Sequence, residues 1–539
     1  MSLELFATIK LDAGDRLVAL IGIATATKYY DARIVAVDDI HREISVQPGE
    51  FRAAEITLQL DDTDDFFSDI RTAEPLLGRV IEVSLFDPTI GESDATIVAA
   101  GTISGWSADA NTFSITAEDL GLNRLDQVID DRIDTTKFPD LPDDTPRELV
   151  PLVIGLVSSA GTGQSNSGAI PCYLVDPAAT SAKYVYVACQ REVIAVENVY
   201  VYGVLTASGF TTHTRTYGSQ TYTTIEFTAD QRDVGRSNEL EVTADIDGIS
   251  DDGTASGNRI ANPAKIWEEV LLQNGFVAGD IDATSVTAAR NSYAARSVTG
   301  GFASIDLDET LRDILEKFAV SFNLTTFATR AGKFGVTVPE PGAAPTADQV
   351  TFDESTIARD SLAYGASEEL ASSIDFFHSR NWHTELYDIE GQYSDALQVS
   401  RLGRDVRLSV DLPYVRDATS ASAMVNDKAF FLSDNRVVVQ LSADVAELRN
   451  IDVGDTCIVK HFGGFPFAPT SFRVLGAGLS FDGANMLLAL SLIDISQAAF
   501  TFGVAFKALK EERELIRTNY GRPTRPYGMG VGLGMRFIT

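Results

Sequence analysis

The side chains best suited to catalysis are few, and their spacing matches no known reactive arrangement. The five histidines are His41, His213, His378, His383 and His461. His378 and His383 lie five residues apart, which matches no helical metal-binding pair. Cys457 and His461 lie four residues apart in a strand-like segment, so their side chains would stand about 13 Å apart along the strand. A nucleophile paired with a base is therefore not expected there, and each histidine is expected to be structural or solvated.

Cysteine usage indicates folding in a reducing compartment. The chain has only Cys172, Cys189 and Cys457, and none of them lies in a Cys-x-x-Cys pair. Three cysteines in 539 residues cannot form a disulfide framework.

Two clusters of aspartates are the best candidates for a metal site. One cluster is Asp245, Asp247, Asp251 and Asp252, which are expected in a single loop, and the other is Asp61, Asp62, Asp64 and Asp65. Neither has the ordered ligand spacing and the final glutamate of a calcium-binding hand. Solvated acidic faces are the expectation, bound Ca²⁺ is the alternative, and the sequence predicts no metal and no cofactor.

Two glycine-containing segments also fail to match a reactive motif. GQSNS at 163–167 lacks the second glycine of a hydrolase nucleophile elbow, and no helix pattern follows it. GMGVGLG, near the end of the chain, has glycine at every second position, which fits neither a dinucleotide loop nor a phosphate loop. Binding is thus a better expectation than catalysis, and no enzyme is predicted.

The overall composition favours a soluble protein with real hydrophobic cores. Hydrophobic residues make up 45% of the 539, and 77 acidic against 43 basic side chains give a net charge of −34. Such an acidic surplus repels phosphate backbones, so stable nucleic-acid binding is not expected. The apolar run at 17–26 follows Asp12 and Asp15, where a secretory leader would be basic, and it is too short to span a bilayer. It is predicted to be a buried strand in a chain without a leader or a transmembrane segment.

Strand patterns dominate both ends of the chain. Between 32 and 122, and again between 403 and 494, short runs of β-branched and apolar residues alternate with turn signals. Within the first block, 61–69 is expected to be a loop or a single helical turn. The predicted fold class is mainly β with a small α+β unit, as a multidomain chain with two antiparallel β-barrel-like domains plus inserted domains.

Helix signals are confined to the middle of the chain and to one later segment. Asn262-Pro263 opens a helix that Gly275 should end, because asparagine and proline suit the helix start and glycine suits its stop. From Asp308 an apolar stripe recurs at helical spacing: Leu311, Ile314, Leu315, Phe318, Ala319 and Phe322. A hairpin turning at Ala331-Gly332 follows, and a helix is expected at 420–432.

These patterns suggest five parts. The expected division is 1–125 as an N-terminal β-barrel, 126–260 as a strand-rich inserted or partner-binding domain, 261–345 as an α+β domain, 346–500 as a second β-barrel with a connecting segment, and 501–539 as a basic, glycine-rich arm.

The order of these elements resembles the baseplate-hub or tail-tip proteins of long-tailed bacteriophages. Between 55 and 120 the chain carries AEITLQLDD, LLGRVIEVSLFD, AAGTIS and FSITAEDL, which match four successive features of that family's N-terminal barrel. DETLRDILEKFAVSFN with its hairpin resembles the small α+β unit, and IDVGDTCIVKH resembles the entry to the second barrel. The resemblance covers about two thirds of the chain. It does not extend to 126–260, and no lysozyme-like domain is present.

The resemblance implies a structural virion protein of the tail tip. Such a hub forms a ring, most often a homotrimer, in which two barrels per subunit supply six similar units around the DNA channel below a sixfold tail tube. Its expected partners are the distal tail protein, the tape-measure protein and fibre or central tip proteins, with DNA only in transit during genome ejection. The implied location is the virion, after folding and assembly in the host cytoplasm. The acidic surplus would suit a lumen that DNA does not adhere to, or it would serve solubility alone.

The C-terminal segment is expected to be an assembly arm that extends onto a neighbouring subunit or tail protein. The residues assigned to this arm are Arg517, Arg522, Arg525, Met529, Val531, Leu533, Met535 and Arg536. The competing hypothesis is a carbohydrate-binding or carbohydrate-cleaving β protein that uses aspartates with Trp106, Trp267 and Trp382. These tryptophans are scattered among unlike contexts, which argues against a sugar-stacking platform.

Overall fold

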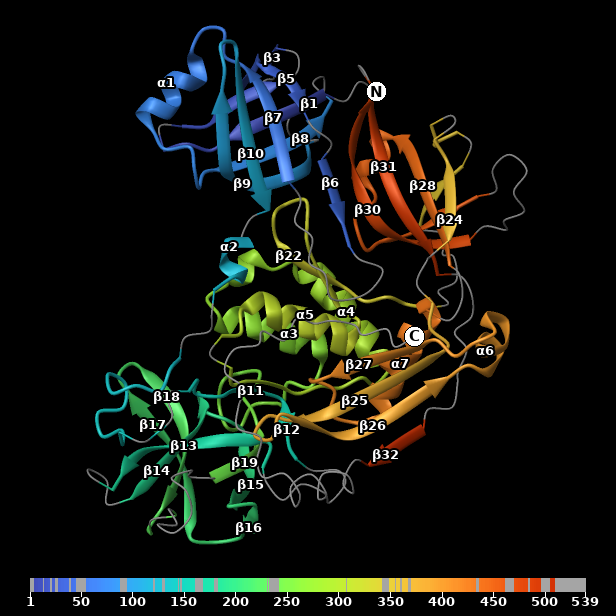
Figure 1. Cartoon of the computed structure of the whole chain (residues 1–539). Coiled ribbons are helices and arrows are strands. Elements are labelled where there is room, and N and C mark those ends of the chain that lie inside the picture. Colours follow the sequence, from blue (N-terminus) through green and yellow to red (C-terminus); the bar gives the residue numbers. More distant parts are fainter. Residues whose placement is uncertain are drawn as a thin grey trace.

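The structure is a computed structural model in which the strands form several sheets around a central layer of helices (Figure 1). It describes residues 4–12, 14–19, 22–24, 28–37, 40–44, 55–87, 95–119, 122–127, 131–143, 145, 148–159, 168–178, 183–229, 231, 242–306, 308–341, 349–353, 355–358, 361–366, 370–432, 436–460, 470–482, 485–495 and 505–508. The prediction of a mainly β, multidomain chain with a small α+β unit is confirmed.

The first β domain is a nine-stranded sheet with the order β3-β4-β2-β1-β8-β9-β10-β7-β5. Its strands are β1 (Glu4–Ile9), β2 (Arg16–Ala19), β3 (Ile23–Ala24), β4 (Tyr29–Ala32), β5 (Ile34–Val37), β7 (Glu55–Asp61), β8 (Val80–Phe86), β9 (Thr96–Ala108) and β10 (Thr112–Asp119). Helix α1 (Phe66–Ala73) lies between β7 and β8. Buried and partly exposed side chains alternate along β8, as expected for a strand with one face on a core.

The second β domain lies beside the first and is built mainly from the end of the chain (Figure 1). Its strands are β23 (Val350–Phe352), β24 (Ala363–Ala366), β28 (Val437–Asp444), β29 (Thr456–Val459), β30 (Thr470–Asp482) and β31 (Asn485–Asp494), with the short 3₁₀ helix η3 (Val445–Arg449) between β28 and β29. A strand from the N-terminal part, β6 (Ile40–Glu43), completes the sheet by pairing with β30. One continuous hydrophobic cluster runs through both β domains.

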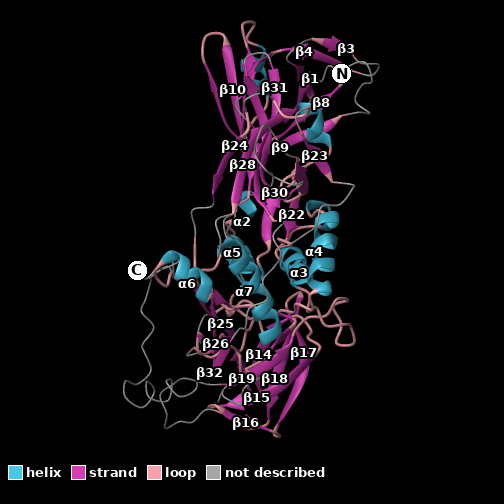
Figure 2. Ribbon diagram, turned by 90° about the vertical axis from the view of Figure 1, so that its right-hand side faces the viewer, coloured by secondary structure: helices cyan, strands magenta, loops and turns pink. Residues whose placement is uncertain are grey.

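A layer of helices crosses the middle of the elongated molecule, with strands above and below it (Figure 2). Its elements are α2 (Leu122–Leu125), α3 (Pro263–Gln273), the 3₁₀ turn η2 (Ala278–Asp280), α4 (Ala283–Ala295), α5 (Leu311–Phe322), β21 (Thr325–Ala328) and β22 (Phe334–Thr337). Asn262 caps α3, and Thr310 forms a capping box with Asp313 at the start of α5. All six residues of the predicted apolar stripe on α5 are buried, so both predicted helices and the hairpin are confirmed.

Below the helices lie a third β domain and a separate four-stranded sheet (Figure 1). The third β domain contains β12 (Leu156–Val157), β13 (Ile170–Pro177), β14 (Tyr184–Gln190), β15 (Ala195–Val201), β16 (Val204–Thr206), β17 (Phe210–Tyr217), β18 (Gln220–Phe227) and β19 (Val242–Asp247), and the pair β11 (Leu152–Ile154) with β20 (Phe302–Ser304) adjoins it. The four-stranded sheet contains β25 (Ser373–Asn381), β26 (Leu386–Ser394), β27 (Arg407–Leu412) and β32 (Ala505–Ala508), with helices α6 (Ala396–Leu402) and α7 (Ala418–Leu432).

Residues 346–500 were expected to hold a second β-barrel with a connecting segment, and three strands of this range lie outside the second β domain. Strands β25, β26 and β27 form their own sheet, and their apolar residues share one core with the helical layer and the third β domain. Phe376 of β25 and Leu408 of β27 belong to that core together with Phe318 of α5. The chain returns to the second β domain only after the predicted helix α7, which is confirmed.

Several local elements also differ from the prediction. The run 17–26 is divided into two strands, β2 and β3, instead of one. The segment 61–69 begins an eight-residue helix, because the buried Asp62 carboxylate accepts from the Phe67 amide at 2.6 Å and the Ser68 hydroxyl at 2.7 Å. Helix α4 was not predicted, since it buries only three side chains, Val286, Ala289 and Tyr293. Its start is marked only by the cap in which the Asp282 carboxylate accepts from the Ser285 amide.

The pairing is antiparallel almost throughout. Three parallel pairs occur among the described strands: β2 with β4, β23 with β29, and β25 with β27. Parallel neighbours need a crossover, and in the β25–β27 case the crossover carries β26 and α6.

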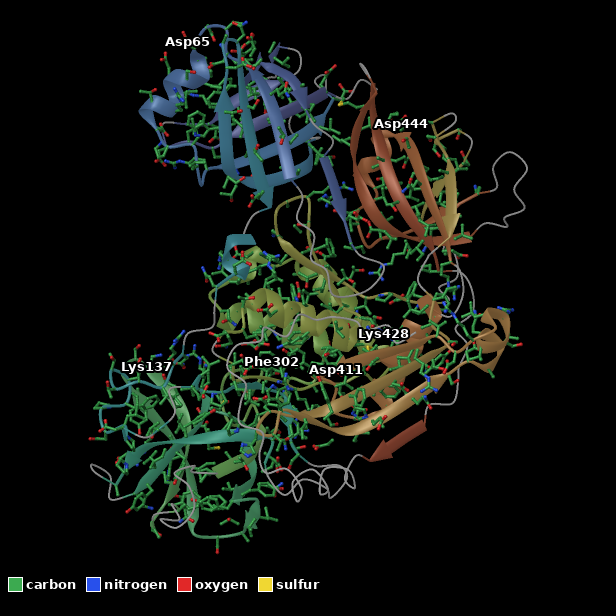
Figure 3. All side chains as sticks on the ribbon, viewed as in Figure 1. Asp65, Lys137, Phe302, Asp411, Lys428 and Asp444 are labelled. Atoms are coloured by element: carbon green, nitrogen blue, oxygen red, sulfur yellow. The ribbon has the colours of Figure 1, made fainter. Side chains whose placement is uncertain are left out.

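Lys428 of α7 is a buried cation in this otherwise apolar region (Figure 3). Burial lowers the pKa of its ammonium group to about 7, against a weaker opposing effect of Asp427. The lowered pKa means that the folded chain binds fewer protons than the unfolded chain above pH 7. Stability therefore rises with pH from about 7 towards the ordinary lysine pKa.

We expect Lys428→Met to flatten that pH dependence and to raise the free energy of unfolding at pH 7 by on the order of 3 kcal/mol. Urea denaturation at pH 7 and pH 9 measures both quantities, and the difference between variant and parent isolates Lys428 from other titrating groups. Lys265→Met is the control, because the ammonium group of Lys265 pairs with Glu268 at the partly exposed surface of α3. Equal pH slopes in the parent chain and the Lys428 variant would contradict the expectation.

Candidate functional site

The cysteines and His378 are poorly placed for catalysis. All three thiols are buried. Burial raises the pKa of Cys189 to about 12 and also raises those of Cys172 and Cys457, so the reactive thiolate is disfavoured. His378 is fully buried beside the Ser379 hydroxyl, and burial lowers its pKa to about 4. Residue 461 lies outside the described residues, so the predicted separation from Cys457 stays a prediction.

Asp245 and Asp247 do not lie in a loop, contrary to the expectation for that cluster. Both are on β19, a strand that pairs with β12, β13 and β15 and is therefore surrounded by other strands. The Asp245 carboxylate is fully buried and accepts hydrogen bonds from two backbone amides and three side chains: Ser159 N at 2.7 Å, Ala169 N at 3.1 Å, Ser159 Oγ at 3.2 Å, Asn198 Nδ2 at 3.2 Å and Tyr200 OH at 3.3 Å. This carboxylate holds segments together, as buried charges do when they are fully hydrogen-bonded.

Several other aspartates of the two clusters also have local structural partners. Asp247 forms an ion pair with Arg259, and Asp251 and Asp252 accept hydrogen bonds from the turn that follows β19. In the first β domain, Arg33 binds Asp64 through two hydrogen bonds of 2.8 and 2.9 Å. Among the residues that the structure describes, no group of three or more His, Cys, Asp or Glu side chains could hold a metal ion.

The three tryptophans do not form a common surface. Trp267 is fully buried and donates to the Thr326 hydroxyl at 3.0 Å, and Trp382 is buried against Tyr414. Trp106 is 38% exposed and stacks on Phe113. A sugar-stacking platform made of these three side chains is therefore not present.

The residues assigned to the assembly arm lie outside the described residues. They are Arg517, Arg522, Arg525, Met529, Val531, Leu533, Met535 and Arg536. Of 501–539, the structure describes only β32, which pairs with β26 of the same chain. The role of the arm stays a prediction.

The most constrained arrangement in the molecule is the crossing of β6 from the first β domain to the second. Strand β5 pairs with β7 in the first sheet, and a few residues later β6 pairs antiparallel with β30 in the other sheet. The register places Ile40 opposite Leu479 and Glu43 opposite Gly476. Because backbone hydrogen bonds of β6 complete the second sheet, the two β domains are held together by shared sheet structure.

An ion cluster with two nearly buried arginines and a partly exposed carboxylate links this crossing to the helical layer. The Asp452 carboxylate lies 2.7 Å from Arg42 Nη1 of β6 and 3.4 Å from Arg330 Nε, which belongs to the turn of the β21–β22 hairpin. Both arginine side chains are nearly buried, and burial lowers the pKa of Arg330 while Asp452 opposes that effect. One carboxylate thus joins the first β domain, the second β domain and the α+β unit.

The turn that carries Asp452 is tightly enclosed. Gly454 has a φ of +87°, and a Cβ there would lie 2.9 Å from the side chain of Thr337 in β22. The Thr337 hydroxyl accepts from Arg473 of β30 at 3.0 Å. The turn within IDVGDTCIVKH, the segment that resembles the entry to the second barrel, is therefore the meeting point of three parts of the fold, and only glycine fits at position 454 beside Thr337.

The first and second β domains share one topology. The order β8-β9-β10-β7-β5 in the first corresponds to β29-β30-β31-β28-β24 in the second, and all these pairs are antiparallel. A helical segment follows β7 in one domain and β28 in the other. Asp65 and Asp444, which begin these segments, both lie at the ends of their domains that face away from the helical layer (Figure 3).

The correspondence extends to single hydrogen bonds. Ile103 of β9 donates to Arg79 O at 2.8 Å and accepts from Gly78 N at 2.9 Å. In the second domain, Val474 of β30 makes the same two bonds, donating to Asp455 O and accepting from Gly454 N, each at 2.9 Å. Gly78 and Gly454 both have positive φ, +82° and +87°.

The long strands also share a β-bulge at the same place. Ser104 is the extra residue between the paired positions of β9 and β10, and Leu475 is the extra residue between those of β30 and β31. A bulge is a specific backbone feature, so its repetition one residue after Ile103 and after Val474 indicates two copies of one structural unit.

We expect Asp452→Ala to lower the free energy of unfolding by about 3 kcal/mol, because it removes the carboxylate that two nearly buried guanidinium groups share. Urea denaturation measures the loss. Asp12→Ala is the matched control: Asp12 pairs with Arg79 at the surface, with 75% of its side chain exposed, so no measurable change is expected. Similar small effects of both substitutions would show that the Asp452 cluster does not hold the domains.

No helix in the described part of the chain is both long and apolar enough to cross a membrane. Neither a protein-family model nor a curated protein sequence matches the chain.

Solved structures match over most of its length. The 43 kDa tail protein of prophage MuSo2 from Shewanella oneidensis is 11% identical with a TM-score of 0.41, and the match covers 91% of this chain and 98% of that one. A tail protein from Neisseria meningitidis is 9% identical with a TM-score of 0.39, covering 91% and 96%. Prophage tail protein gp18 from Listeria monocytogenes is 8% identical with a TM-score of 0.37, covering 92% and 95%. All three of these structures are of tail proteins, and two of them come from prophages.

Proposed function

We propose that the chain is a structural virion protein of a phage tail tip, a baseplate hub that forms a ring around the DNA channel below the tail tube. The observation that carries this proposal is the repetition of one β unit in the two β domains, side by side in one chain. Three copies of the chain would place six similar units around an axis, which matches a sixfold tube. A homotrimer is therefore the proposed assembly.

Stiffness supports the same role. The two β domains share a sheet through β6, one hydrophobic cluster runs through both, and Asp452 links them to the helical layer. A ring that connects a tube to distal components has to keep its shape under load, and shared sheets with packed cores supply that rigidity. The described residues contain no converging reactive set, and the proposed role is not enzymatic.

Charge bears on how DNA would pass the ring. The net charge of −34 disfavours adhesion of a polyanion, so an acidic lumen would let the genome slide through during ejection. The alternative, that the acidity serves solubility alone, stays open.

The proposed partners follow from the same architecture. The first and second β domains would face the tail tube and contact the distal tail and tape-measure proteins. The third β domain and the arm would meet fibre or central tip proteins. The proposed location is the virion, after assembly in the host cytoplasm.

We expect the purified chain to form closed rings with a central opening in negative-stain electron microscopy, with a mass of three chains by light scattering. The physical reason is that a unit repeated twice per chain can close with sixfold pseudo-symmetry around an axis. A chain that stays monomeric at high concentration and cleaves a polysaccharide would refute the proposal in favour of the carbohydrate-active alternative.

Deleting residues 515–539 is expected to impair assembly and to leave the isolated fold intact, because the arginines of this segment are proposed to pair with the acidic body of a neighbouring copy. Light scattering measures assembly, and the midpoint of thermal unfolding by circular dichroism measures the fold. A full-length variant with glutamine at Arg517, Arg522, Arg525 and Arg536 separates the charge of the arm from its length. Normal assembly of the truncated chain would exclude the arm as an assembly element.

A further inference from the structure

In the second β domain, β6 covers both the edge of β30 and the turn before β29. It pairs with the four residues after the bulge of β30, where Ala477 and Leu479 are buried. Arg42 of β6, opposite Ala477, pairs with Asp452 in the turn. The next residue of the turn, Val453, is only 3% exposed. One added strand thus closes this side of the second β domain.

The turn before β8 repeats the turn before β29 but is not closed in this way. Both turns contain a hydrogen bond of 3.1 Å across four residues, followed by the two bonds to the long strand described above. Leu76 takes the place of Asp452, and Leu77 takes the place of Val453. Leu77 is 56% exposed. The first turn therefore exposes an apolar side chain, and at the position of Asp452 it has no carboxylate that could receive an arginine.

The edge of β9 beyond its bulge is uncovered as well. The four residues after the bulge are Gly105 to Ala108, and no described strand pairs with them on the side away from β10. Trp106 is 38% exposed there. Its ring is held by Phe113, with ring centroids 5.7 Å apart, and by the guanidinium group of Arg71 at 4.6 Å. Leu77 adjoins the same edge, because its turn is hydrogen-bonded to β9.

The backbone groups that this edge presents follow from the hairpin that β9 forms with β10. Asp109 N donates to Thr112 O at 3.0 Å, so this pair is hydrogen-bonded across the hairpin. Bonded pairs alternate with non-bonded pairs along an antiparallel ladder. Ala108 and Trp106 therefore direct their N–H and C=O groups away from β10, where an added strand can bind them.

An added strand must carry apolar side chains at every second position. Residues that lie opposite one another in a sheet share a face. Trp106 and Ala108 lie opposite Ile115 and Phe113 of β10, which are fully buried. The residues of an added strand that pair with Trp106 and Ala108 therefore point their side chains to this apolar inner side.

We infer that residues 529–535 of a second copy of the chain bind this edge as a strand antiparallel to β9. In this segment glycine alternates with four apolar residues, Met529, Val531, Leu533 and Met535. As a strand it presents one apolar face and one face without side chains, as the edge requires. The inference rests on the proposed ring. It assigns the end of the arm to a contact between copies and leaves the rest of the arm for the tip proteins.

The position and charge of the arm favour a second copy as the source. The arm follows β32, which lies below the helical layer on the side of the second β domain, away from the first (Figure 1). In a head-to-tail ring, the second β domain of one copy adjoins the first β domain of the next. The 20 residues between Ala508 and Met529 span up to about 70 Å, roughly twice the diameter of a small domain. From 515 onward the arm has four arginines and no acid, so an acidic neighbour attracts it.

Disulfide cross-linking of full-length double variants tests the contact. Ala108→Cys is combined in turn with Met529→Cys, Val531→Cys, Leu533→Cys or Met535→Cys. A residue that pairs with Ala108 lies about 5.5 Å away between Cα atoms, which a disulfide spans. All three native cysteines are buried, so the background should be low. Under mild oxidation, at least one of the four variants should give covalent dimers and trimers on a non-reducing gel.

Two controls make the test specific. Ala108→Cys combined with Gly530→Cys, Gly532→Cys or Gly534→Cys should give at least tenfold less cross-link, because these positions face the other side of the strand. Leu77→Asp, added to the best cross-linking variant, should also lower the yield at least tenfold. Val277→Asp, at a residue that is 62% exposed on η2, should leave it unchanged. Unchanged circular dichroism confirms the fold of each variant.

The outcomes separate this contact from the ring itself. A trimer that gives no cross-link at any of the four apolar positions, or equal cross-linking at the glycine positions, overturns the inference and leaves the ring standing. A disulfide that forms within one chain does the same. A parent chain that light scattering shows to be monomeric overturns both.

Discussion

The fold depends on a strand that pairs with a sheet other than that of its neighbours in the chain. Strand β6 follows β5 of the first β domain by a few residues and completes the second β domain on β30. Its Arg42 is then committed to Asp452, which also holds Arg330 from the helical layer. The two nearly buried guanidinium groups are stabilised by the carboxylate that they share. Loss of any one of the three charges would therefore weaken the attachment of all three parts of the molecule.

The second organising feature is the repeat of one β unit. The two units share their strand order, a glycine with positive φ just before β8 and β29, and a bulge in the long strands β9 and β30. Their sequences nevertheless show no residue-level repeat. Backbone hydrogen bonding therefore defines the unit, and the side chains are adapted to different surroundings. Leu475 at the second bulge is buried and its carbonyl accepts from Ile44 at 2.7 Å, while Ser104 at the first bulge is exposed.

Local signals in the sequence predicted the local elements well. The cap at Asn262 and the stripe on α5 are short-range patterns, so the helices and the hairpin after them could be identified. The start of the second helix was placed at Asp308, two residues before the cap that the structure shows at Thr310. The partner of β6 could not, because pairing between residues more than 400 positions apart leaves no trace in a local pattern. Asp245 was assigned to a loop for a related reason: aspartate is typical of turns, and only the neighbouring strands supply the five donors that make it a core residue. For the candidate site, the sequence drew attention to the segment IDVGDTCIVKH but not to the arginines that meet at its turn.

The long sequence separation between β6 and β30 has a consequence for biosynthesis. A ribosome that has completed β6 must add about 430 further residues before β30 exists, which takes roughly 20 to 90 seconds at ~5–20 residues per second. Throughout that interval the nascent chain carries a strand, β6, whose final partner has not been translated. An unpaired strand is a site for mispairing, so a chaperone that shields nascent chains would assist the folding of this protein.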